Sequence, residues 1–120
     1  MSGKPGPTMA GVMALFSRLS QDFEAMDLKE HFTGFYEAIL ADPRITTVHI
    51  SMYMALLLAY LLHEGENPIQ IDRDSLMQYA KVSSRATYYK SLHDLDIFGY
   101  IKYIPSHNLF LGSLVYLKRI

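Results

Sequence analysis

The side chains best suited to chemistry lie in the stretch KVSSRATYYKSLHDLDIFGYIKY, residues 81–103. Arg85 can donate two parallel hydrogen bonds to a guanine edge, and Lys90 can neutralise a phosphate. The hydroxyl groups of Ser84 and Thr87 suit phosphate or base contacts, and a helix N-terminus at this point favours a phosphate. These residue types at helical spacing are typical of a surface that binds nucleic acid.

Two adjacent tyrosines, Tyr88 and Tyr89, decide which side of this segment faces solvent. Neighbours on a helix are about 100° apart, so both rings cannot point into the core. Tyr88 shares a face with Leu92 and Leu95, and the spacing predicts that this face is buried. Tyr89 lies with Arg85 on the other face, where its hydroxyl group can donate to a sugar-phosphate backbone.

The same pattern also fits an amphipathic surface helix that merely has a polar outer face. That interpretation predicts mixed charge along the face, and Asp94 and Asp96 lie in the second half of the segment. If the helix lies in a DNA groove, these two carboxylates lie at the end where the helix leaves the groove. They therefore count little against DNA binding. Thr87 also has two possible roles, because its position on the helix allows its side chain to contact DNA or to face the preceding helix.

Hydrophobic periodicity predicts helices over residues 10–20, 27–41, 48–64, 72–80 and 84–98. Short runs predict extended segments over residues 67–71, 100–104 and 113–118. Turn-forming residues join the last two segments into a hairpin. The expected fold class is mainly α with a small β-hairpin.

From residue 46 onward this order of elements resembles a winged helix-turn-helix domain. The resemblance is carried by IDRDSLMQYAKVSSRATYYKSLHDLDIFGYIKY, with its serine cap, its spaced leucines and the GYI that opens a hairpin. The wider stretch from HISMYMALLLAYLL to the final GS is similar to short regulators from bacterial conjugative elements. The resemblance implies a winged helix-turn-helix domain at 46–120. Hydrophobic spacing predicts an N-terminal helical extension at 9–45, and the Gly/Pro-rich start of the chain predicts a disordered tail at residues 1–8.

The resemblance also implies that the hairpin loop forms a wing. Lys102 on its first strand, and Ser106, His107 and Asn108 at its tip, would touch the DNA backbone or minor groove. Residues 109–111, Leu-Phe-Leu, are unusually apolar for a tip placed in water over DNA. The alternative is that these three side chains fold back on the body or form a protein interface.

Charge is distributed unevenly along a chain whose net charge is −1. Residues 81–120 contain six basic and two acidic side chains, whereas residues 1–80 contain five basic and ten acidic ones. A basic C-terminal third on an acidic body indicates a local site for a polyanion. The competing interpretation is that these surface cations only keep the protein in solution.

Several classes of protein are disfavoured by composition. The chain has no cysteine, and its five histidines are scattered, so a metal site is not expected. No phosphate-binding glycine loop and no paired catalytic carboxylates are visible, which argues against an enzyme, a cofactor or a small-molecule ligand. The longest apolar run, residues 52–62, is far shorter than the roughly 20 residues that cross a bilayer, so we expect a cytoplasmic protein without membrane contact.

Two functions follow from these observations as hypotheses. The first is a sequence-specific transcriptional regulator that binds double-stranded DNA with the helix at 84–98 in the major groove. It would act as a homodimer through the helix at 48–62 and the helices before it. The second is a winged-helix protein-interaction or accessory module of a mobile-element excision, transfer or replication complex, favoured by the near-neutral net charge and the apolar wing.

Overall fold

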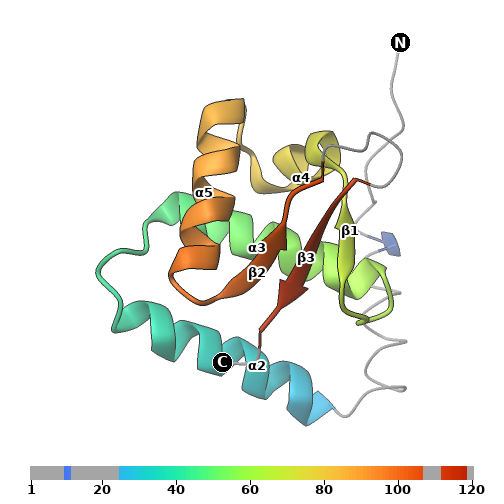
Figure 1. The fold of residues 1–120 in the computed structure, drawn as a ribbon. Helices are drawn as coiled ribbons and strands as arrows, with labels where there is room; N and C mark the ends of the chain where they lie inside the picture. Colours follow the sequence, from blue (N-terminus) through green and yellow to red (C-terminus); the bar gives the residue numbers. More distant parts are fainter. Residues whose placement is uncertain (1–9, 12–24, 107–111, 119–120) are drawn as a thin grey trace.

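The computed structural model describes residues 10–11, 25–106 and 112–118. Its helices are α2 (Ala25–Leu40), α3 (Thr47–Leu62), α4 (Arg73–Ala80) and α5 (Arg85–Ile97), and its strands are β1 (Ile69–Ile71), β2 (Ile101–Ile104) and β3 (Ser113–Leu117) (Figure 1). The described part is mainly helical with a small antiparallel sheet. This confirms the expected fold class, mainly α with a small β component. Of the helix expected over residues 10–20, only residues 10–11 are described, and both are helical.

The sheet has three strands in the order β1-β3-β2, and both pairs are antiparallel. The expectation of a two-stranded hairpin was therefore incomplete, because β1 pairs with the free side of β3. Val115 lies at the centre, opposite Ile69 on one side and Tyr103 on the other. The inner face of the sheet consists of six buried side chains, those of Ile69, Ile71, Ile101, Tyr103, Val115 and Leu117.

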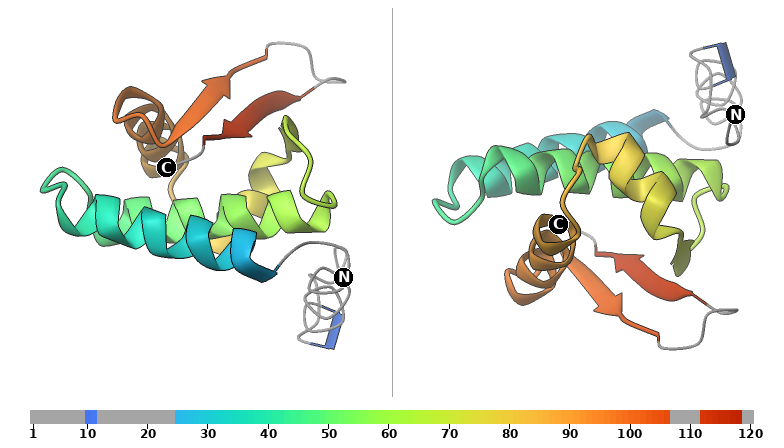
Figure 2. Two further views of the ribbon diagram at one scale, coloured as in Figure 1. Left: turned by 90° about the horizontal axis from the view of Figure 1, so that it is seen from below. Right: turned by 90° about the horizontal axis from the view of Figure 1, so that it is seen from above.

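Helix α3 lies between the other layers of the fold. Its sequence, TVHISMYMALLLAYLL, is apolar on every side, so it must be covered from more than one direction. Figure 2 shows α2 running beside α3 on one side, with α5 and the β2–β3 hairpin on the other. Met52, Tyr53 and Leu56 are completely buried as a result.

Aromatic stacking attaches α2 to α3. The Phe35 ring lies parallel to the Tyr53 ring with 4.0 Å between their centroids, and its edge meets the Tyr100 ring at 6.0 Å. The Nε2 atom of His31 lies 2.6 Å from the Tyr53 hydroxyl group. Phe35 and Ile39 are buried in the same core as the sheet and α5, so α2 contributes directly to that core.

The loop between α2 and α3 is attached to the turn between α5 and β2. The Asp42 carboxylate accepts hydrogen bonds from Arg44 Nε at 2.8 Å and from the Tyr100 hydroxyl group at 2.9 Å. The Arg44 guanidinium group lies 4.2 Å from the centre of the Phe98 ring. Hydrogen bonding to Arg44 holds the pKa of Asp42 well below its usual range, and burial with the Asp42 hydrogen bond raises the pKa of Tyr100 to about 12.

Local signals set the ends of α4 and α5. The Asp72 side chain accepts a hydrogen bond from Ser75 N at 3.2 Å and caps α4. Lys81 ends α4 with a φ of 59° in the left-handed region. Gly99, with a φ of 91°, follows α5 and turns the chain into β2, in a conformation that other residues rarely adopt.

Within the described residues, no helix combines the length and the apolar composition needed to cross a bilayer. Helix α3 is apolar throughout but has 16 residues, against the roughly 20 that a membrane span requires. Its apolar side chains instead fill the core between α2, α5 and the sheet.

His31 should make the stability of the fold depend on pH. Burial lowers the pKa of His31 from its usual value of 6.5, so the unfolded chain takes up this proton more readily than the folded chain. Stability is then complete above about pH 6.5 and falls as the pH drops toward the lowered pKa. We expect the melting temperature to fall more steeply from about pH 7.5 to about pH 5.5 in the native protein than in His31→Gln, which cannot titrate there. Equal slopes in the two proteins would contradict this role.

Candidate nucleic-acid interface

One buried face holds α5 in place. Tyr88, Leu92 and Leu95 are at most 2% exposed, and Ser91 is buried with them. The helix packs against α3 and β2 through this side. Burial also raises the pKa of the Tyr88 hydroxyl group. The sequence-based prediction that Tyr88 is the tyrosine that packs is confirmed.

The opposite face of α5 is open to solvent. Its exposed residues are Arg85, Ala86, Tyr89, Lys90, His93 and Ile97. Tyr89 is 39% exposed, so the second half of the tyrosine prediction is also confirmed. No described residue forms a hydrogen bond or an ion pair with the Arg85 side chain. Arg85 is therefore available to an anion from outside the chain.

Ser84 and Thr87 form the N-terminal end of this face. Ser84 is the N-cap of α5, and its Oγ accepts a hydrogen bond from Thr87 N at 3.3 Å. The Ser84 side chain is exposed, and its hydroxyl proton can still be donated outward. Thr87 is half-buried, in keeping with the alternative that it faces the rest of the fold.

Lys90 is exposed, but its charge is already compensated. Its Nζ lies 2.9 Å from Oδ2 of Asp94, one turn further along α5. A spacing of four residues brings these opposite charges together while the Lys90 side chain stays exposed, so its contact with a phosphate remains a prediction. The Lys90 hydrogen bond, followed by one from His49, lowers the pKa of Asp94. A phosphate would have to displace Asp94 from Lys90.

His49 fixes Asp94 from the side of α3. This histidine is 7% exposed, and its Nε2 lies 2.8 Å from Oδ2 of Asp94. Its Nδ1 accepts a hydrogen bond from Thr46 N at 2.9 Å, so the ring proton lies on Nε2 and is donated to Asp94. Asp94 thereby joins α5 to the first turn of α3.

Arg73 is a basic residue of this surface that was missed from the sequence. Its Nη1 atom donates to the Tyr89 hydroxyl oxygen at 3.4 Å, and its Nε lies 3.3 Å from Oδ1 of Asp74. Arg73 precedes Tyr89 by 16 residues, so no helical period connects the two. The turn between α4 and α5 brings them together. The Tyr89 hydroxyl proton stays free to be donated outward.

The residues expected in the wing are only partly described. Lys102 is exposed on the outward side of β2, directly opposite Tyr116 of β3. Ser106 lies just beyond β2, and its backbone N–H donates to the Ser113 hydroxyl oxygen at 3.2 Å. His107, Asn108 and the apolar residues 109–111 lie outside the described residues.

These elements gather at one end of the molecule. Figure 1 shows α4, the start of α5, the end of β2 and the start of β3 together at that end. Arg73 and Lys90 each lie beside an aspartate, whereas Lys81 and Arg85 have no acidic partner among residues 25–106 and 112–118. The arrangement can attract a polyanion to α5. The net positive charge of this surface is smaller than its number of basic residues suggests, because two of them lie beside aspartates.

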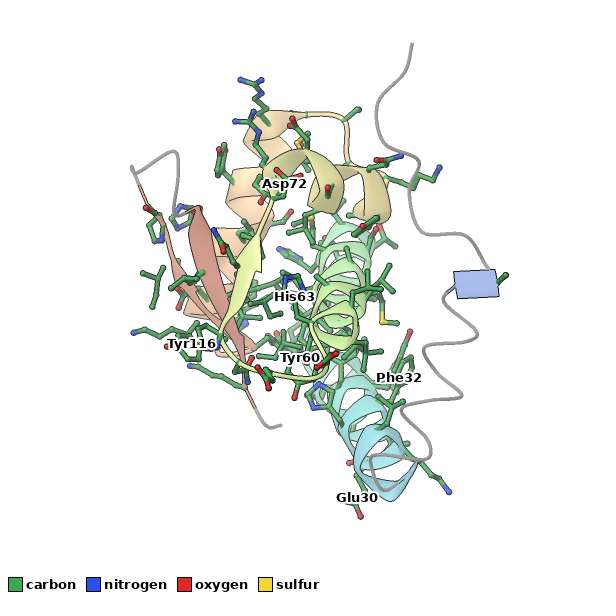
Figure 3. The ribbon with its side chains drawn as sticks, turned by 90° about the vertical axis from the view of Figure 1, so that its right-hand side faces the viewer. Glu30, Phe32, Tyr60, His63, Asp72 and Tyr116 are labelled. Atoms are coloured by element: carbon green, nitrogen blue, oxygen red, sulfur yellow. The ribbon has the colours of Figure 1, made fainter. Side chains whose placement is uncertain are left out.

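A shallow hollow of about 380 Å³ lies between α3, β1 and α4. His63 and Asp72, labelled in Figure 3, are on its wall. In the described part of the chain, no buried side-chain N or O atom lacks a hydrogen-bond partner, and no three His, Asp or Glu side chains could together hold a metal ion. The described residues therefore indicate no metal site, and the lining of the hollow indicates no particular chemistry.

The two tyrosines allow a matched test of the buried face. Tyr88→Ala should lower the free energy of unfolding by roughly 3–5 kcal/mol, the usual cost of deleting a buried aromatic ring. Tyr89→Ala should cost about 1 kcal/mol or less, because that ring is half-exposed and makes an edge contact with Tyr88. Urea denaturation measures both values, and equal losses would contradict the orientation of α5.

Asp94 and Lys90 allow a second comparison. Asp94→Ala should lower the free energy of unfolding by about 1–3 kcal/mol, because it leaves the buried Nε2–H group of His49 without its acceptor. Lys90→Ala should cost less than about 0.5 kcal/mol, since an exposed ion pair within one helix contributes little. Thermal or urea denaturation distinguishes the two. A Lys90→Ala loss as large as that of Asp94→Ala would mean that the ion pair, and not His49, holds Asp94.

No protein-family model matches the chain, and searches of curated proteins and of solved structures found no significant match. A role for the α5 surface therefore has to be derived from its own residues, contacts and charges. Those features place an exposed tyrosine, a helix N-terminus and an arginine with no partner among the described residues on one face.

Proposed function

We propose that residues 46–120 form a winged helix-turn-helix domain that binds double-stranded DNA as a sequence-specific transcriptional regulator. The order of α3, β1, α4, α5, β2 and β3 supports this proposal, because a short helix, a tight turn and a second helix are followed by two paired antiparallel strands. In such a domain α5 is the recognition helix, and the loop after β2 is the wing.

The observation that carries the proposal is the exposed N-terminal half of α5. Arg85 lies next to the capping residue Ser84, has no described partner, and projects from a helix whose other face is anchored by Tyr88. A major groove about 12 Å wide admits one helix, and the N-terminal residues of that helix reach the base edges. An anchored helix with a free arginine at this end suits that geometry.

The contacts divide into base reading and backbone positioning. Arg85 is the residue proposed to read a guanine edge through two hydrogen bonds, while Ala86 allows close approach. Ser84, Tyr89 and Arg73 are proposed to position the helix on phosphates. Lys90 would join them only after exchanging Asp94 for a phosphate. Lys102 is exposed on the outward side of the sheet, on β2 and not on α5.

A homodimer remains part of the proposal, because many two-fold symmetric sites are read by two copies of one domain. The interface was expected on α3 and the helices before it, and eight residues of α3 are buried within the chain. We therefore propose the α2 part of that surface, where Phe32, Tyr36 and Leu40 are exposed apolar side chains. A regulator of this kind would work in the cytoplasm.

The second candidate is a winged-helix protein-interaction or accessory module of a mobile-element complex. The pairing of Lys90 with Asp94 favours it, because it removes one cation from the DNA-binding face. This candidate predicts that any DNA binding is weak, indifferent to sequence and lost at modest salt.

Arg85→Ala provides the test of the DNA proposal. Duplexes are first selected from a random pool with the native protein, and their affinities are then measured by fluorescence anisotropy. We expect Arg85→Ala to bind the selected duplex roughly 5- to 150-fold more weakly, which corresponds to the 1–3 kcal/mol that one bidentate base contact contributes. Its melting temperature should stay unchanged because the side chain has no described partner.

Lys29→Ala removes an exposed cation from α2 and serves as the matched control, which should bind like the native protein. If no duplex is enriched, or if Arg85→Ala binds the selected duplex as tightly as the native protein does, the proposal is overturned.

A further inference from the structure

The sheet has an outer face that does not take part in the core. Side chains alternate between the two faces of a strand, so the residues between the buried ones point outward. We call this surface the outer sheet face; it consists of Gln70, Lys102, Ile104, Leu114, Tyr116 and Lys118. Figure 3 shows Tyr116 on the side of the sheet that is turned away from α3.

The centre of the outer sheet face is apolar. Ile104 lies directly opposite Leu114, and Tyr116 lies opposite Lys102, so the strand register places these side chains in adjoining rows. Ile104 is 39% exposed and Tyr116 is 38% exposed. Two neighbouring, half-exposed large apolar side chains form a patch of the kind that protein partners use.

Both charged residues of the outer sheet face are lysines, although the Asp96 carboxylate lies at the neighbouring edge of β2. Lys102 and Lys118 are both exposed, and none of the six residues of the outer sheet face is acidic. Two copies meeting through this face would bring like charges together, which disfavours self-association. One aromatic ring among aliphatic side chains also makes a poor stacking platform for nucleic acid. The chemistry fits a protein segment that carries carboxylates beside aliphatic side chains.

Docking at the face is also favoured over addition of a strand to the sheet edge at β2. The backbone N–H of Tyr103 in β2 donates to Oδ2 of Asp96 at 3.1 Å. This hydrogen bond occupies a donor that an added strand would need. A partner would therefore lie across the exposed side chains of β2 and β3.

We propose that the outer sheet face binds a protein segment in which Asp or Glu residues flank aliphatic side chains. The aliphatic side chains would cover Ile104, Leu114 and Tyr116, and the carboxylates would meet Lys102 and Lys118. This site is separate from the α5 surface, so it does not depend on the DNA proposal.

The test is a selection of peptides displayed on phage against the native full chain. Enriched sequences should combine Asp or Glu with Leu, Ile or Phe. A synthetic peptide of the enriched sequence should bind about tenfold or more weakly to Ile104→Glu and to Tyr116→Glu, since each places a carboxylate in an apolar contact. Ile97→Glu makes the same change at an exposed isoleucine of α5 and should keep nearly full affinity.

Four results would overturn the proposal. The first is that no peptide is enriched, and the second is that the enriched peptide binds both sheet variants as tightly as the native chain. The third is a large drop in melting temperature in both variants, which would mean that the chain's own atoms cover the face. The fourth is that the variants abolish binding of a labelled oligothymidine, or dissociate a dimer detected by sedimentation, instead of peptide binding. Failure of the DNA proposal would leave the peptide result unaffected, and the reverse also holds.

Discussion

The burial of Tyr88, Leu92 and Leu95 against α3 and the sheet is the interaction on which the rest of the structure depends. Each of these side chains contributes roughly 1.5–3 kcal/mol when fully buried. An exposed ion pair such as that between Lys90 and Asp94 contributes less than about 1 kcal/mol. Apolar burial therefore sets the rotation of α5 about its axis, and that rotation decides which side chains meet solvent.

Polar contacts between distant segments then refine the position of α5. His49 holds Asp94 from α3, and the Asp42–Tyr100 hydrogen bond attaches the α2–α3 loop to the turn that follows α5. The functional consequence is that Asp94 is held beside Lys90 and reduces the positive charge on the exposed face of α5. Because Asp94 compensates Lys90, Arg85 becomes the cation on which a DNA-binding role for α5 most depends.

Much of this arrangement was predictable from local sequence. The serine cap of α5, its end near Gly99 and the different orientations of the two tyrosines all depend on residues within one or two helical turns. The spacing of four between Lys90 and Asp94 was also visible in the sequence, although its effect on the free charge was underestimated.

The contacts that could not be predicted join residues far apart in the chain. His49 and Asp94 are 45 residues apart in the sequence, and Arg73 and Tyr89 are 16 apart. No periodic pattern in the sequence therefore predicts either contact. The pairing of β1 with β3 likewise depends on tertiary packing, since a three-residue strand carries too little local information to specify its partner.

We propose that the N-terminal half of α5 is the surface that contacts DNA. Amide chemical shifts of the isotopically labelled protein, followed by NMR during titration with a selected duplex, measure this directly. The account predicts that the largest changes occur at residues 84–90 and at Arg73, while the outer sheet face changes little. Largest changes on α2 or on the outer sheet face, with residues 84–90 unaffected, would contradict it.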